Sequence, residues 1–230
     1  SYIWETTNSW AAPGWSTVHL VNDLMGNDVV EIGGYGIAAV YQYTSMSSGT
    51  SSHTVLIWNW AYKAIDNMNN IIAKIDNVPG DDAKRARIKS QAYALRGYMY
   101  LTLATHYAHS YFTDPEQLCA PIYTEPTVAG NRGKTQSKLS DVDTQAESDL
   151  KEAYNNIGSY TRSAKYKIDQ NVIAGLLARV YLQTGKWSDA ESYAEKAHEG
   201  YSWMSETDYK AGFNSLTNAE WIWGQGSGSD

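Results

Sequence analysis

Cysteine, clustered positive charge and long apolar runs are all scarce in this sequence. The single cysteine, Cys119, excludes an internal disulfide framework and a CxxC metal site. Lysine and arginine number 18 against 25 acidic residues, the net charge is −7, and no basic run is present, so no nucleic-acid partner is expected. No stretch approaches the roughly 18 unbroken apolar residues of a membrane span, which predicts a soluble segment.

Phenylalanine is also scarce, but the other two aromatic residues are abundant. The sequence has 18 tyrosines and 9 tryptophans against 2 phenylalanines. Tyrosine and tryptophan combine a flat apolar face with a polar donor, and this suits surfaces that contact partly polar ligands. A helical core that is unusually rich in tyrosine would give the same composition, so composition alone leaves both interpretations open.

The dominant pattern is helical, because apolar residues recur at steps of three and four. Gly- and Ser-rich residues 33–54 and Pro-containing residues 109–139 are expected to be long connections. Asp81 or Asp82, the pair Ser140 and Asp143, Asp169, and the pair Ser188 and Glu191 are candidate helix starts. Residues 220–223 are a candidate strand. The expected helices cover about 15–25, 55–77, 83–106, 140–157, 170–183 and 188–199.

The last two of these helices are expected to form a close antiparallel hairpin. Small residues stand where two helices must approach each other, and Leu177 and Tyr181 are expected to fill the groove between them. The spacing is that of a tetratricopeptide-like repeat. The sequence therefore predicts an all-α fold of tetratricopeptide-like helical repeats (an α/α superhelix) with long loops, as one domain over 1–230. The small residues are Ala178, Gly185, Ala190, Ala194 and Ala197.

Five segments, in this order along the chain, resemble the SusD/RagB family of outer-membrane nutrient-binding lipoproteins. Asp143 and Ala146 depart from the family pattern, in which Tyr and Ile are usual, and this weakens the match of the third helix. The segments are Trp58-x-x-x-Tyr62-x-x-Ile65-x-x-x-Asn69; Lys89-Ser-Gln-Ala-Tyr-Ala-Leu-Arg96-Gly-Tyr-Met-Tyr100; Arg132 followed by Asp149-Leu150-Lys-Glu-Ala153; Ala174–Leu182 with Gly185-Lys-Trp187-x-x-Ala190; and Tyr209-x-x-x-Phe213 with Glu220–Trp223.

The resemblance implies a cell-surface protein that captures a nutrient and delivers it to a transporter. In the family the ligand is usually an oligosaccharide, although RagB-like members handle peptides, and the partner is a SusC-like TonB-dependent outer-membrane barrel. Family members carry a lipidated N-terminus and a long C-terminal half. We therefore expect this chain to be a fragment, held at the outer membrane only through a lipid anchor outside the segment.

Catalytic and metal-binding patterns are not found in the sequence. His106-x-x-His109 lacks a third ligand nearby and is interpreted as a structural pair at a helix end. Glu147, Asp149 and Glu152 are expected on a solvated helix face rather than flanking a sugar as in a glycosidase. No enzymatic activity, metal or cofactor is therefore predicted.

The segment around the first long connection is the predicted ligand site. Loops on a rigid helical scaffold are where binding residues concentrate, and flat aromatic rings with nearby acceptors suit a sugar ring and its hydroxyls. Asp28 and Glu31 could instead serve as a cap or in a turn. Trp58 and Trp187 are expected in the core, whereas Trp60 lies off the apolar stripe. The predicted ligand-binding residues are Asn27, Asp28, Glu31, Tyr35, Tyr41, Tyr43 and Trp60.

Two other functions remain compatible with the sequence. A tetratricopeptide adaptor would bind protein partners in its concave groove, and a helical enzyme would degrade glycans. A lipobox cysteine after a signal peptide in the complete gene would favour the nutrient-binding protein. The absence of such a cysteine would favour the adaptor. Turnover of a glycan would favour the enzyme.

Overall fold

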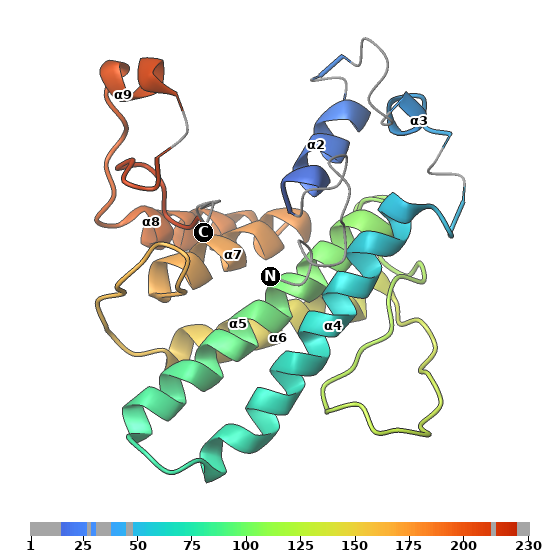
Figure 1. Cartoon of the computed structure of the whole chain (residues 1–230), viewed down its shortest axis with the longest axis horizontal. Helices are drawn as coiled ribbons and strands as arrows, with labels where there is room; N and C mark the ends of the chain where they lie inside the picture. The colour runs from blue at the N-terminus through green and yellow to red at the C-terminus, as the bar shows by residue number, and fades with distance from the viewer. Residues whose placement is uncertain (1–14, 27–28, 31–37, 45–47, 213–214, 225–230) are drawn as a thin grey trace, which may run out of the picture. The chain divides into compact units, whose positions relative to one another are not determined.

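The computed structural model describes residues 15–26, 29–30, 38–44, 48–212 and 215–224. The all-α fold is confirmed: over these ranges the chain forms helices and connections, with one isolated β-bridge between Leu118 and Lys138. Residues 220–223 form turns and bends, so the predicted strand is wrong. The helices are α2 (Trp15–Met25), α3 (Ala38–Tyr41), α4 (Ser52–Lys74), the 3-10 helix η2 (Ile75–Asn77), α5 (Asp82–Tyr107), α6 (Leu139–Asn156), α7 (Gln170–Gln183), α8 (Trp187–His198) and α9 (Glu206–Ala211) (Figure 1).

The chain divides into two compact units, residues 1–63 and 64–230, and the division falls within α4. In the first unit α2 packs against α3. Val21, Leu24 and Val40 form a small buried cluster, and Met25 and Tyr41 pack against it. The long connection predicted for 33–54 therefore contains the short helix α3, and α4 begins at Ser52, within the predicted connection.

The second unit is a row of helices in which α5 packs on α6, α6 on α7, and α7 on α8 (Figure 1). Helices α5 and α6 are in close contact at Gly97. A Cβ atom there would lie 2.9 Å from Leu150 Cγ and 3.0 Å from the carbonyl oxygen of Ala146. A side chain at position 97 would therefore collide with α6, and glycine is the residue that permits this contact.

Helix α7 of the α7–α8 hairpin begins and ends as predicted. The Asp169 side chain accepts a hydrogen bond from Val172 N at 3.1 Å and so caps α7, and Gly185 follows α7 with a φ of 75°. Ala190 and Ala197 are buried, as expected for a close helix pair, whereas Ala194 is exposed and lies outside the contact.

Predictions at the starts of α8 and α6 are wrong. Helix α8 follows Lys186 without a side-chain cap, so Ser188 and Glu191 do not open it. Trp187 is 59% exposed instead of buried, because α8 begins at Trp187 itself and the indole stacks on Phe112 beside the turn, with ring centroids 5.7 Å apart. The capping box of Ser140 and Asp143 does not form either. Helix α6 begins at Leu139 after Lys138, which makes no side-chain cap, and the Asp143 side chain is buried.

Candidate functional site

A buried ion pair joins α5 to α6 in the second unit. Arg96 on α5 binds Asp149 on α6 with two hydrogen bonds, Nη2 to Oδ1 at 2.6 Å and Nε to Oδ2 at 2.8 Å. Arg96 is 4% exposed and Asp149 2% exposed. The prediction that Asp149 lies on a solvated helix face is therefore wrong, whereas Glu152, one turn further on, is exposed as expected. Two hydrogen bonds of matched geometry satisfy both charges.

The same arginine connects the ion pair to α4 and to the connection after α5. Arg96 Nη1 donates to Asn69 Oδ1 at 2.8 Å, and Asn69 Nδ2 donates to the carbonyl oxygens of Tyr123 and Glu125 at 3.1 and 2.9 Å. The Tyr100 hydroxyl donates to Tyr123 O at 2.8 Å. These side chains satisfy the backbone of residues 123–125, which has no strand partner among the described residues, and so fix the connection on the helices.

Two further buried groups show raised pKa values. Burial raises the pKa of Asp143 to about 7, although a hydrogen bond of 2.7 Å from Gln183 Nε2 and the charge of Lys186 oppose the shift. Burial also raises the pKa of the Cys119 thiol to about 12. A protonated thiol is a poor nucleophile. Cys119 therefore serves packing in this structure.

The predicted ligand residues fall into two groups. Asn27, Asp28, Glu31 and Tyr35 lie outside the described residues. The other three, Tyr41, Tyr43 and Trp60, belong to the first compact unit. Tyr41 is half-buried on the Val40 cluster, Tyr43 follows α3 and is 48% exposed, and Trp60 is half-buried in α4.

Tyr43 has an unusual backbone conformation for a residue with a side chain. Its φ is 60°, in the left-handed region that favours glycine. Its amide donates to Val40 O at 2.9 Å, and its hydroxyl donates to the carbonyl oxygen of Met25 at the end of α2. The ring is thereby held at Met25, the last residue of α2, which precedes Asn27 by two positions in the sequence. Almost half of the Tyr43 surface remains exposed. Strained positions of this kind are enriched at ligand sites.

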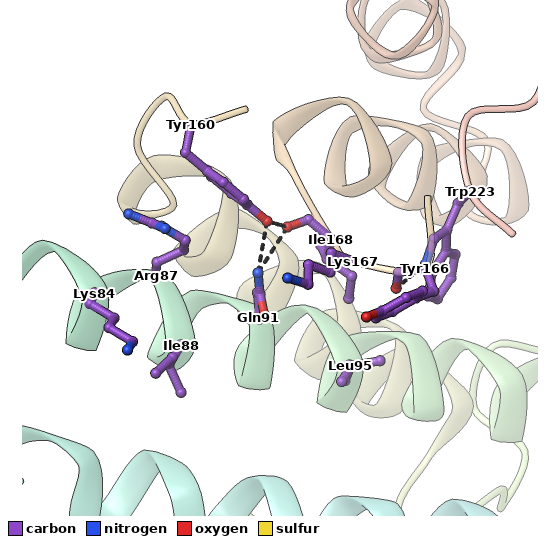
Figure 2. Close-up of a pocket in the computed structure, with 10 residues that line it drawn as sticks. All are labelled: Lys84, Arg87, Ile88, Gln91, Leu95, Tyr160, Tyr166, Lys167, Ile168 and Trp223. Atoms are coloured by element: carbon purple, nitrogen blue, oxygen red, sulfur yellow. Dashed lines mark hydrogen bonds between the residues drawn. The ribbon is translucent and has the colours of Figure 1, made fainter. Parts of the chain in front are cut away.

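A pocket of about 400 Å³ lies on the second unit along one face of α5 (Figure 2). Its size is typical of small-molecule sites. Positions 84, 87, 88, 91 and 95 share this face because they are three or four residues apart. The opposite wall comes from the connection between α6 and α7 and from Trp223. The lining residues are Lys84, Arg87, Ile88, Gln91, Leu95, Tyr160, Tyr166, Lys167, Ile168 and Trp223.

Hydrogen bonds fix the aromatic wall of this pocket. Gln91 Nε2 donates to the Tyr160 hydroxyl at 2.8 Å and to Ile168 O at 3.1 Å (Figure 2). The indole Nε1 of Trp223 donates to Tyr166 O at 3.0 Å, and its ring meets Tyr98 edge to face at 5.5 Å. Because the indole is held at its nitrogen and against Tyr98, its orientation is set before any ligand enters.

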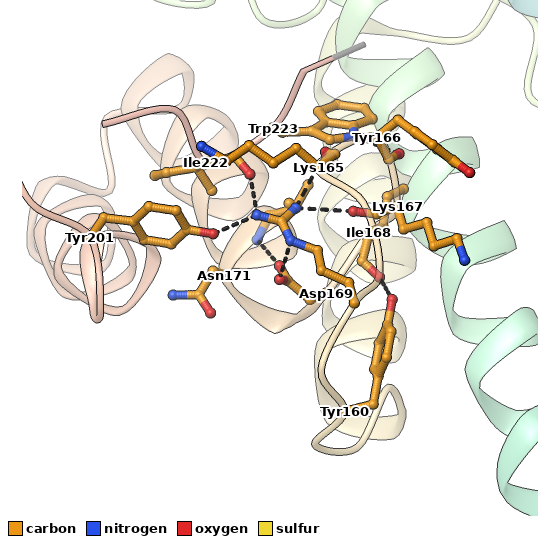
Figure 3. A network of polar contacts seen from close by, with 12 residues as sticks. Tyr160, Lys165, Tyr166, Lys167, Ile168, Asp169, Asn171, Tyr201, Ile222 and Trp223 are labelled. Atoms are coloured by element: carbon orange, nitrogen blue, oxygen red, sulfur yellow. Dashed lines mark hydrogen bonds and ion pairs between the residues drawn. The ribbon is translucent and has the colours of Figure 1, made fainter. Parts of the chain in front are cut away.

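Arg162 joins the separate segments that form this wall. Figure 3 labels its partners Asp169, Lys167, Tyr201 and Ile222. Its Nε lies 2.8 Å from Asp169 Oδ2, and Nη1 donates to Lys167 O at 3.0 Å. Its Nη2 donates to the Tyr201 hydroxyl and to Ile222 O. One largely buried guanidinium thus ties the start of α7 to the residue directly before Trp223. The sequence reasoning missed this arginine, whose only signal was its place in a connection with Lys165 and Lys167.

His106, the first histidine of the His106-x-x-His109 pair, lies in the last turn of α5. Nδ1 of His106 lies 2.8 Å from Thr102 O, within the last turns of α5. In the described ranges, no group of three or more His, Cys, Asp or Glu side chains is arranged to hold a metal ion. No helix in the same part of the chain is both long enough and apolar enough to cross a membrane.

Comparison with known families gives a match over most of the chain. Residues 18–182 match the model of the SusD-like family described as starch-binding and associating with the outer membrane. The comparison with curated proteins gives no match.

Solved structures similar to this chain come from the same superfamily. A SusD-like carbohydrate-binding protein from Bacteroides vulgatus has a TM-score of 0.89 and 42% identity, over 97% of this chain and 47% of its own. A SusD superfamily protein from Bacteroides thetaiotaomicron has a TM-score of 0.72 and 25% identity, over 83% and 42%. A laminarin-binding SusD-like protein shares only the fold, with a TM-score of 0.58 and 23% identity, over 74% and 35%. The chain spans about half the length of the structures it matches or less.

Proposed function

Because the chain belongs to the SusD-like family, we propose that it captures an oligosaccharide at the cell surface and passes it to a TonB-dependent outer-membrane transporter. The family match over residues 18–182 is the observation that carries this proposal. The similar structure from Bacteroides vulgatus, a carbohydrate-binding protein, supports a sugar ligand over the peptide ligand of RagB-like members. The role is one of binding, without turnover of the glycan.

Within this function, the first unit supplies the predicted contacts with the glycan. Tyr43 is the best supported of them, since its ring is exposed and its hydroxyl is anchored at the end of α2. A sugar ring would stack on the exposed face of Tyr43. Trp60 and the four residues outside the described ranges, Asn27, Asp28, Glu31 and Tyr35, remain part of this proposed site. Tyr41 packs on the Val40 cluster, so its removal would also affect stability.

Substitution of Tyr43 tests the site. A glycan array first identifies an oligosaccharide that the chain binds, and calorimetry then compares the wild type with Tyr43→Phe and Tyr43→Ala. We expect Tyr43→Ala to lose about 0.5–1.5 kcal/mol of binding free energy, the contribution of one aromatic contact. Tyr43→Phe keeps the ring but loses the hydrogen bond to Met25 O, so it should lose less than Tyr43→Ala. The control is Tyr209→Ala, which removes an exposed tyrosine of the second unit. Equal affinity of Tyr43→Ala and the wild type would remove Tyr43 from the site.

Delivery to a transporter requires a stable partner in the outer membrane. We propose a SusC-like TonB-dependent barrel as this partner, and a lipid anchor as the means by which the whole protein is held at the cell surface. Affinity purification of the whole protein from native membranes should recover such a barrel through a large interface. Recovery of soluble cytoplasmic proteins alone would instead favour a tetratricopeptide adaptor.

A further inference from the structure

The α5 pocket gathers positive charge in a chain whose net charge is −7. Lys84, Arg87 and Lys167 line it, and within the described ranges none of the three forms an ion pair. The Arg87 guanidinium lies over the ring of Tyr160, 4.5 Å from its centroid, and Lys167 Nζ donates to Ser163 Oγ at 2.7 Å. In the described ranges no carboxylate therefore pairs directly with any of the three, and an acidic ligand can supply one.

Two of the three carboxylates nearest to these cations in the sequence pair with other arginines, and the third, Asp81, interacts electrostatically with Arg87. Asp82 pairs with Arg85, Asp169 pairs with Arg162, and Asp81 Oδ1 accepts a hydrogen bond from the Lys84 amide as the cap of α5. The described lining of the pocket holds three cations and no carboxylate, and this composition favours anionic ligands although the whole molecule is acidic.

The rest of the pocket suits the apolar face of a sugar ring. Ile88 and Leu95 contribute aliphatic surface from α5, and Tyr166 is 56% exposed next to the fixed indole of Trp223. In Figure 2 the Lys84 and Arg87 side chains lie at one end of the pocket, and the rings of Tyr166 and Trp223 lie at the other. Lys84 and Leu95 are separated by about 16 Å along the helix at 1.5 Å per residue. A ligand of more than one ring is needed to span this length.

We propose that this pocket binds an anionic oligosaccharide, with sugar rings on Tyr166 and Trp223 and carboxylate or sulfate groups at Lys84, Arg87 and Lys167. This inference rests on the proposed function as a glycan-binding protein. It adds a second glycan contact, which belongs to the second unit, whereas Tyr43 belongs to the first. Rings that pack on the aromatic end place the acidic substituents of a neighbouring sugar near the basic end. A neutral glycan would bring no carboxylate or sulfate group to the three cations.

The experiment compares charged and neutral forms of one ligand. Calorimetry at low ionic strength measures binding of trigalacturonic acid, its methyl ester, and a sulfated galactose trisaccharide. The variants are Lys84→Gln/Arg87→Gln and, as a control with the same change of charge, Lys210→Gln/Arg179→Gln on exposed positions of α9 and α7. Melting temperatures establish that every variant is folded.

We expect at least one anionic trisaccharide to bind the wild type more tightly than the methyl ester does. The Lys84→Gln/Arg87→Gln variant should lose about 5- to 10-fold in affinity for that ligand, and the control variant should not. The difference should shrink as ionic strength rises toward about 1 M, where the screening length is about 3 Å. Tighter binding of the carboxylated or of the sulfated ligand identifies the acidic group.

Equal affinity for the charged and esterified ligands, or equal losses in the two double variants, would overturn the proposal. Binding of a neutral glycan that is sensitive to Tyr43→Ala, with no binding of either anionic trisaccharide, would overturn this pocket's role and leave the proposed function intact. NMR tests the pocket independently of affinity. The indole signal of Trp223 should shift when trigalacturonic acid is added and should not shift when its methyl ester is added.

Discussion

At the scale of single residues, Arg96 holds three segments of the second unit together through Asp149, Asn69 and the backbone at Thr124. Removal of one member of a buried ion pair leaves an uncompensated charge. We therefore expect Arg96→Met to lower the free energy of unfolding by about 3–5 kcal/mol in urea denaturation. Arg96→Met/Asp149→Leu should lose less than the sum of the two single variants. Additive losses would mean that Arg96 and Asp149 are not coupled. The control is Lys210→Met, which removes one member of the exposed ion pair with Glu206.

Asp143 gives a second prediction at this scale, on the pH dependence of stability. Burial raises its pKa from 3.8 to about 7 in the folded chain. Below the unfolded pKa both states hold the proton. Between the two values only the unfolded state ionises, so stability falls with rising pH by up to about 1.4 kcal/mol per unit, and the loss is complete above the folded pKa.

The variant Asp143→Asn removes this titration. Near pH 4 the free energy of unfolding of this variant should be closest to that of the wild type. As the pH rises to values above 7, the variant should become increasingly more stable than the wild type, as measured by urea denaturation across this range. Parallel curves for the two proteins would contradict the raised pKa. Asp141, an exposed carboxylate on the same helix, provides the control substitution Asp141→Asn.

Single residues are also where the sequence was least informative. Helical periodicity placed Asp149 on a polar face, but periodicity along one helix carries no information about an arginine on another. Arg96 stands among apolar residues of α5, and this was the available signal that a buried carboxylate must face it. Tyr43 was predicted as a ligand residue from its neighbours in a Gly- and Ser-rich stretch, whereas its positive φ was not predictable from them.

At the scale of elements, the contact between α5 and α6 depends on Gly97. Alanine favours a helix over glycine by about 1 kcal/mol. A Cβ at Gly97 would nevertheless lie 2.9 Å from Leu150 Cγ, so we expect Gly97→Ala to destabilise the chain by about 1–3 kcal/mol in thermal or urea denaturation.

Gly175 on α7 provides the matched control. A Cβ there would lie 3.6 Å from Ala197 Cβ, an ordinary contact, so Gly175→Ala should be neutral or stabilising. The same direction of change in both variants would mean that helix propensity decides the result and that the α5–α6 contact does not.

Helix positions were predictable where a local signal decides them. The caps of α5 at Asp81 and of α7 at Asp169, and the end of α7 before Gly185, follow from side chains within four residues. The start of α6 was set instead by burial of Leu139 and Val142, against the local capping pattern. The α5 pocket could not be predicted, because its walls come from segments far apart in the sequence that Arg162 brings together.

At the scale of the whole molecule, the chain spans about half the length of the structure from Bacteroides vulgatus. The two compact units carry separate candidate contacts with glycans, around Tyr43 in the first and along α5 in the second. If both are used, the affinity for an anionic oligosaccharide should fall in Tyr43→Ala and in Lys84→Gln/Arg87→Gln, whereas a neutral oligosaccharide should respond to Tyr43→Ala alone.

Binding without turnover is the central claim, and one titration tests it most directly. Calorimetry of the chain with the oligosaccharide selected on the array, followed by chromatography of the ligand recovered from the cell, measures affinity and integrity together. We predict saturable binding and recovery of the intact oligosaccharide after prolonged incubation. Absence of saturable binding to any glycan on the array, or recovery of shortened products, would contradict the account.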